Sequence, residues 1–198
     1  MQKNSFVFLV ILLGVALIAA NYAFSADGAG RAAIRFMADS AFFLFSVSLI
    51  LGPLAVIDPK YASLIEPRRA VGLAAFFFAA FHITLVSGIY FSWQPLAALA
   101  LLPNIVAVPA AFVLLLTALT ASDFAVQKLG MAKWKMVQRL VYIGFAFVLA
   151  HVLLVTNGAG SLGSLQLALL ALAAAAVALQ VYGFYLMRKR KGAASPAA

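Results

Sequence analysis

The chain has 198 residues, of which 66% are hydrophobic and 10% are charged, and its mean hydropathy is +1.10. Ordinary globular domains carry about 25% charged residues, so this composition excludes a typical water-soluble protein. A lipid bilayer accommodates such a chain, because each spanning helix needs about 20 apolar residues. The chain has no cysteine, which excludes disulfides, iron–sulfur clusters and a covalently attached haem.

Hydropathy predicts six apolar spans, near residues 6–24, 38–57, 70–91, 105–121, 137–156 and 164–187. Backbone polar groups in hydrocarbon must be satisfied within their own segment, so runs of this length are expected to be helices. The predicted fold is therefore an all-α integral membrane protein, a bundle of six transmembrane helices.

The segments between the spans are expected to be connections. The stretch 93–104 is apolar but contains Pro95 and Pro103, so we expect a short interfacial segment there and not a seventh span. Residues 123–135 are expected to form another connection. The chain has no obvious internal repeat, and we expect a single transmembrane domain over residues 1–192 with a short disordered tail at 193–198.

The basic residues are divided unequally between the two sides of the predicted bundle. If both termini are cytoplasmic, 12 of the 14 Lys and Arg residues lie on the cytoplasmic side, and only Arg31 and Arg35 lie on the other. This asymmetry follows the positive-inside rule and predicts a multi-pass protein of a bacterial inner membrane, in contact with lipid. Because the basic residues are dispersed among membrane loops, a nucleic-acid partner is not expected.

The first span has a second interpretation. Lys3, the apolar run and Ala23-Phe24-Ser25 resemble a signal peptide with a small-x-small cleavage site. Cleavage would leave five helices, with the new N-terminus outside. We expect residues 1–25 to be retained, because the run is long enough to span, and neither outcome changes the candidate site.

The candidate functional residues are the two histidines of the chain, His82 and His151. Apart from charges at helix ends, they are the only ionisable residues that we place inside the spans, where such groups are costly and mark functional sites. They lie twelve and fourteen residues into the third and fifth spans, which predicts similar depths in the periplasmic half of the bilayer. Two imidazoles at matched depth on two helices suit the axial ligation of a b-type haem.

Other interpretations of the histidines stay open from the residues alone. Buried histidines that only bond to backbone or to hydroxyls, such as those of Thr84, Ser87 and Thr156, are an equal alternative. Zinc is disfavoured because two ligands are too few. A proton relay or a transporter is disfavoured because we place no carboxylate inside the spans. Ala75 and Gly144, each seven residues before a histidine, are expected to leave room for a macrocycle.

Several stretches of the core, residues 38–156, resemble the ferric reductase-like transmembrane domain family. They are Leu51-Gly52-Pro53, Arg68 to Phe76 leading into His82, Leu119 to Ser122, Leu129-Gly130, Lys133 to Lys135, and Gln138 to Tyr142 followed by His151. Within that family the chain is most similar to MsrQ-like haem-binding membrane subunits. The resemblance implies a transmembrane electron-transfer cytochrome with His82 and His151 as the axial ligands of the haem iron.

One position departs from the family pattern. Where the family has histidine in W-K-x-x-H-R-L-x-Y, this chain has Gln138, whose neutral amide is a poor iron ligand. We therefore expect one haem b and not two. Arg68, Gln138 and Arg139 are candidates to bind a flavin or a quinone on the cytoplasmic side.

The expected donor is a separate cytoplasmic reductase or a quinol. The expected acceptor is a periplasmic oxidoreductase or ferric iron. The alternative function is a cofactor-free membrane scaffold or assembly subunit, in which both histidines are structural.

Overall fold

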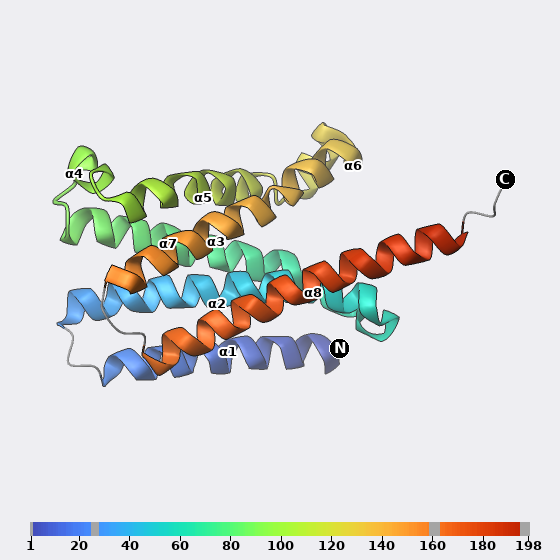
Figure 1. The fold of residues 1–198 in the computed structure, drawn as a ribbon, viewed down its shortest axis with the longest axis horizontal. Helices are drawn as coiled ribbons and strands as arrows, with labels where there is room; N and C mark the ends of the chain where they lie inside the picture. Colours follow the sequence, from blue (N-terminus) through green and yellow to red (C-terminus); the bar gives the residue numbers. More distant parts are fainter. Residues whose placement is uncertain (1, 25–27, 159–162, 195–198) are drawn as a thin grey trace.

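The computed structural model describes residues 2–24, 28–158 and 163–194, and these ranges contain helices and no strand (Figure 1). The helices in chain order are α1 (Gln2–Ala23), α2 (Ala29–Ile57), η1 (Pro59–Leu64), α3 (Ile65–Ile89), α4 (Pro95–Leu99), α5 (Leu102–Leu119), α6 (Asp123–Arg139), α7 (Val141–Gly158) and α8 (Ser164–Ala194). The suggested cleavage site at Ser25 and residues 195–198 of the expected tail lie outside the described residues.

The long apolar helices confirm the all-α prediction for the described part of the chain. Five helical stretches are long and apolar enough to cross a membrane: Ala29–Ile57, Pro59–Ile89, Leu102–Leu119, Asp123–Thr156 and Ser164–Arg190. The first expected span corresponds to α1, whose apolar part is shorter than these five. The expected interfacial segment at 93–104 holds the five-residue α4 and the first residues of α5.

Three boundaries differ from the predicted ones. α2 begins at Ala29, well before the expected start at 38, because polar residues lower the local hydropathy without preventing a helix. The expected connection at 123–135 is helical. Ser122 caps the start of α6 by accepting a hydrogen bond from the Ala125 N–H at 3.1 Å, and Gly130, with a φ of 74°, divides α6 into two helical segments. α8 continues to Ala194 and so extends into the expected tail.

α2 is the central helix of the bundle. It packs against α1, α3 and α8, and half of its apolar part is buried, a larger share than in any other spanning stretch. α3 packs most closely on α2, whereas α7 packs most closely on α5. These two pairs meet where the ring of Phe145 on α7 lies 6.1 Å from Phe42 and 5.2 Å from Phe45 of α2. The bundle therefore contains two close helix pairs joined by an aromatic contact.

A proline inside α2 is compensated by α8. Pro53 has no N–H, so the helix bond that would reach the carbonyl of Leu49 is missing. Gln180 of α8 donates to this carbonyl from its Nε2 at 2.7 Å. Gly183 lies against the same proline, because a Cβ at position 183 would be 3.4 Å from the Pro53 Cβ. Both contacts hold α8 against α2, as expected where a neighbouring helix satisfies a freed carbonyl in the membrane.

This arrangement makes Gln180→Leu destabilising. The Leu49 carbonyl would lose its donor in an apolar environment, which costs about 1–3 kcal/mol of unfolding free energy. Pro53→Ala restores an N–H to α2, so in that background Gln180→Leu should cost clearly less. Thermal unfolding of the four proteins in detergent measures the difference. If Gln180→Leu lowered the unfolding free energy equally with Pro53 and with Ala at position 53, the Gln180 side chain would not be compensating for the proline.

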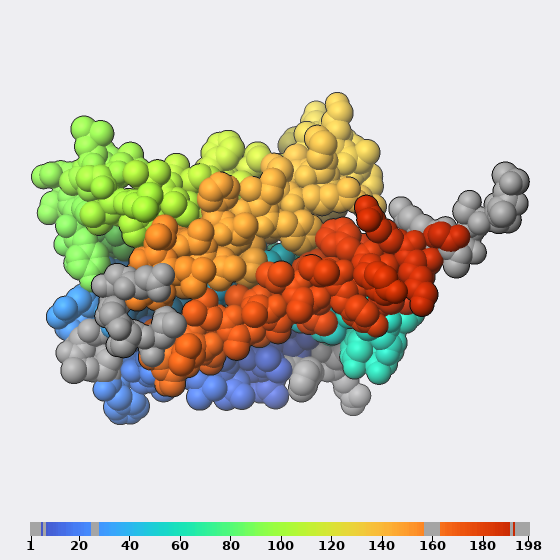
Figure 2. Space-filling model, viewed as in Figure 1, coloured from blue at the N-terminus to red at the C-terminus, as the bar shows by residue number. Residues whose placement is uncertain are grey.

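The two ends of the bundle differ in charge. Figure 1 shows η1, α6 and the C-terminal part of α8 at one end, with α4 and the start of α2 at the other. In the space-filling view, α7 and α8 make up much of one face, with α2 seen only in part behind them (Figure 2). The end with α6 carries the basic residues Lys60, Arg68, Arg69, Lys128, Lys133, Lys135, Arg139, Arg188, Lys189 and Arg190. The opposite end has Arg31 and Arg35 of α2.

Candidate functional site

His82 lies on α3, seven residues before the last residue of that helix, Ile89. Its side chain is partly buried. The ring nitrogen Nδ1 is 3.1 Å from the carbonyl oxygen of Ile34, near the start of α2. A carbonyl oxygen has two lone pairs, so it can accept this bond in addition to a helix bond. His82 is thus held by the helix that packs most closely on its own.

His151 repeats this arrangement in the second helix pair. It lies on α7, seven residues before Gly158, which ends that helix. Its Nδ1 is 2.8 Å from the carbonyl oxygen of Pro103, in the first turn of α5. Each histidine is therefore held by the close partner of its own helix, at an equal distance in residues from the helix end.

The acceptors fix the tautomer of both rings. A carbonyl oxygen can only accept a hydrogen bond, so Nδ1 carries the hydrogen in each histidine. In the neutral ring the lone pair then lies on Nε2, which is the usual state of a metal-ligating histidine. Among the described residues, neither Nε2 has a hydrogen-bond partner.

The donor set restricts which metal group would fit. In the described part of the chain no three His, Cys, Asp or Glu side chains form a metal-binding group, so a bare ion would lack ligands. A haem brings four equatorial nitrogens of its own and needs only axial ligands from the protein. Two imidazoles with oriented Nε2 atoms fit that requirement.

An open apolar groove runs along α7 next to His151. Its lining residues are Tyr142, Ile143, Ala146, Phe147 and Ala150. This surface is shallow and is formed by α7 alone, and His151 is not among its lining residues.

The two small residues expected to leave room for a macrocycle have a different role. A Cβ on Gly144 would lie 2.8 Å from Cγ1 of Val113, so this glycine lets α5 and α7 approach closely. Ala75 is buried at 2% exposure in the core of the bundle. Small residues serve helix packing in membranes, and here they pack helices together.

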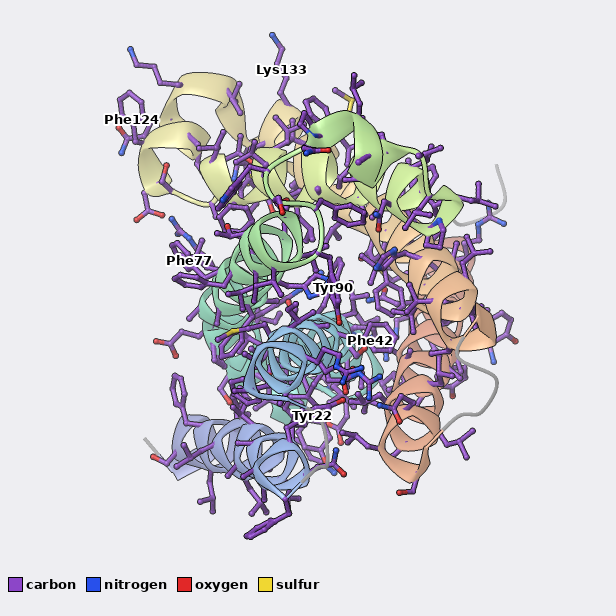
Figure 3. The ribbon with its side chains drawn as sticks, turned by 90° about the vertical axis from the view of Figure 1, so that its left-hand side faces the viewer. Tyr22, Phe42, Phe77, Tyr90, Phe124 and Lys133 are labelled. Carbon is purple, nitrogen blue, oxygen red and sulfur yellow. The ribbon has the colours of Figure 1, made fainter. Side chains whose placement is uncertain are left out.

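A carboxylate lies well inside α2, contrary to the sequence analysis. Asp39 is about 15 Å along the helix from Ala29 at 1.5 Å per residue. The Tyr22 hydroxyl on α1 donates to its Oδ2 at 2.5 Å, and Gln166 on α8 donates to the Tyr22 oxygen at 3.3 Å. Figure 3 shows Tyr22 between α1 and α2. Hydropathy predicts Asp39 to be a charge at a helix end, because the expected span begins at residue 38.

The candidate residues for a flavin or quinone site have separate hydrogen-bond and packing partners. Gln138 donates from Nε2 to the Thr117 carbonyl at 3.1 Å and to the Thr120 hydroxyl at 3.0 Å, at the end of α5. Arg68 lies over Gly52 of α2, where a Cβ would be 2.7 Å from its Nη1, and Arg139 is exposed. Among the described residues, no hydrogen bond or ion pair joins Arg68 to Gln138 or Arg139.

Together these features define a protein whose described residues are all-helical, with several helices of membrane-spanning length and two imidazoles that are each held by the backbone of the neighbouring helix. Over 136 residues, 62% of the chain, it is 30% identical to magnetosome protein MamZ of Magnetospirillum gryphiswaldense. Over the same length it is 27% identical to magnetosome protein MamZ of Paramagnetospirillum magneticum. The chain spans about a fifth of the length of these relatives, 19% and 20%. No family model and no solved structure matches it.

Proposed function

We propose that this protein is a transmembrane electron-transfer cytochrome that holds one b-type haem between His82 and His151. The haem, when bound, supplies the one-electron chemistry. The observation that carries the proposal is the paired orientation of the two rings. Each Nδ1 is bonded to a backbone carbonyl of a neighbouring helix, at 3.1 and 2.8 Å, which leaves both Nε2 atoms with a lone pair.

The chain itself contributes orientation and an apolar environment. The carbonyls of Ile34 and Pro103 hold the imidazoles in one tautomer and increase their basicity as ligands. The surrounding apolar helices exclude water and lower the local dielectric constant, both of which influence a redox potential. The two rings lie on separate helix pairs, so both pairs would contribute to holding a bound haem.

The six-helix, ferric reductase-like topology belongs to the same proposal. The basic end of the bundle is placed in the cytoplasm, with both termini there, in a bacterial inner membrane. The histidines then lie toward the periplasmic side. A cytoplasmic reductase or a quinol is the donor, and a periplasmic oxidoreductase or ferric iron is the acceptor.

A spectrum of the purified full-length chain tests the proposal. After expression with ample haem supply, the dithionite-reduced minus oxidised difference should show a low-spin b-type signal. A pyridine haemochrome assay should give about one haem per chain, since the chain has only two histidines. A colourless protein that unfolds cooperatively would contradict the proposal.

The cofactor-free scaffold remains the competing function, and one observation favours it. The bonds of His82 and His151 to backbone carbonyls are also what a structural histidine needs in an apolar environment. In that case the histidines contribute to stability alone. A folded but colourless protein would then favour the scaffold.

The proposal includes a cytoplasmic docking site for a flavin or quinone formed by Arg68, Gln138 and Arg139. Arg68→Ala and Gln138→Ala should then slow the reduction of the haem by its donor severalfold, while the amount of bound haem stays unchanged. Lys189→Ala, at an exposed position of α8, is the control. Stopped-flow reduction by a menaquinol or a flavin reductase measures the rate. Unchanged rates in both variants would remove these residues from the electron path.

A further inference from the structure

We infer that α6, which Gly130 divides into two helical segments, lies at the membrane interface, and that its outer surface binds the headgroups of anionic phospholipids. This surface consists of Phe124, Lys128, Met131, Lys133, Lys135, Met136 and Arg139. It does not include the histidines, and it shares only Arg139 with the proposed flavin or quinone site.

The inner side of α6 is fixed to the bundle. Ala125 is buried, and Trp134 donates from its Nε1 to the carbonyl of Thr120 at 2.9 Å. At the start of the helix, Arg69 of α3 forms an ion pair with Asp123 at 2.8 Å. These contacts hold α6 against the end of α5, so its opposite side faces outward.

The outer surface combines apolar and basic side chains. Phe124, Met131 and Met136 are 66%, 52% and 64% exposed. In Figure 3, Phe124 and Lys133 both point away from the bundle. The ammonium group of Lys128 lies 5.7 Å from the centre of the Phe124 ring. A long basic side chain beside an apolar ring is the arrangement that places a methylene chain in hydrocarbon and a charge among headgroups.

The charged residues of this surface are almost all positive. Lys128, Lys133, Lys135 and Arg139 are all exposed, and the only acidic residue of the helix, Asp123, is paired with Arg69. Such a surface attracts anions, and the inner leaflet of a membrane is rich in anionic phosphodiesters.

A lipid surface fits better than an acidic soluble protein. Along the chain, α6 connects two apolar helices, α5 and α7. It lies at the end of the bundle where these helices leave the expected membrane. An acidic protein would pair with the lysines, but it would leave no apolar phase for the exposed phenylalanine and methionines. Each of the two segments of α6 carries exposed basic and apolar residues together, which is typical of helices that lie in the membrane interface.

Quenching of Trp134 fluorescence by brominated lipids tests this inference. Trp93→Phe makes Trp134 the single tryptophan of the full-length chain. The protein in neutral detergent is titrated with brominated phosphatidylglycerol or brominated phosphatidylcholine, both on the same preparation. We expect half-maximal quenching at a severalfold lower concentration of the anionic lipid, and 0.5 M salt should remove this preference, as screening requires.

Two matched variants make the result decisive. Lys128→Gln, Lys133→Gln and Lys135→Gln combined should remove the preference for phosphatidylglycerol, whereas Lys→Arg at the same three positions should retain it. Thermal unfolding verifies that both variants fold. Equal quenching by the two lipids in the parent protein would overturn the inference. Displacement of the anionic lipid by polyglutamate but not by salt would also overturn it, in favour of an acidic protein partner.

Discussion

His82→Ala and His151→Ala should each lower haem affinity by far more than tenfold, so that little haem survives purification. The loss of a group that merely orients a metal ligand costs about 10–100-fold in affinity, and the loss of the ligand itself removes an iron–nitrogen bond. Any haem that remains should be five-coordinate and high-spin. The absorption spectrum and the haemochrome count measure both effects.

Matched controls separate ligation from general damage. Thr84→Ala and Thr156→Ala change residues on the same two helices, and each hydroxyl bonds only within its own helix, to Ala80 and to Val152 and Leu153. Both controls should keep the haem content of the parent. If either histidine variant kept a full complement of six-coordinate, low-spin haem, the assignment of the ligands would be wrong.

The helices were largely predictable from the sequence, because hydrocarbon leaves a backbone few alternatives. Runs of leucine, alanine and phenylalanine mark α3, α5, α7 and α8 directly. The missed segments are those where polar residues sit on a helix. α6 alternates basic and apolar residues, and its hydropathy resembles that of a loop although Ser122 caps it as a helix.

The candidate site was predictable only in its residue types. Two intramembrane histidines at matched positions are visible in the sequence, and the structure gives them matching environments. Their acceptors, the carbonyls of Ile34 and Pro103, are 48 residues away from each histidine along the chain. No local pattern predicts such bonds, because backbone carbonyls have no sequence signature. Asp39 was misplaced for a related reason, since its partners come from α1 and α8.

Gly144→Leu is the core substitution for which we expect the largest loss of stability. The added Cβ would lie 2.8 Å from Cγ1 and 3.2 Å from Cβ of Val113, so α5 and α7 would have to separate. Overpacking of this kind costs about 1–3 kcal/mol or more. Separation of these helices would also pull His151 away from the Pro103 carbonyl on α5, so haem affinity should fall together with stability. Thermal unfolding and haem titration measure the two effects.

A double-mutant cycle shows whether this one contact is responsible. Gly192 lies near the end of α8, where an added Cβ meets nothing within 4 Å, so Gly192→Ala reports the intrinsic gain of alanine over glycine in a helix. Gly144→Ala should raise the unfolding free energy by less than Gly192→Ala does, because the added methyl group contacts Val113. Val113→Ala removes the Cγ atoms, so the pair should show a favourable coupling energy of about 0.5–3 kcal/mol. Haem affinity should recover in the double variant if the α5–α7 distance orients His151. Recovery of stability without recovery of haem binding would mean that the Pro103 carbonyl does not position the ligand.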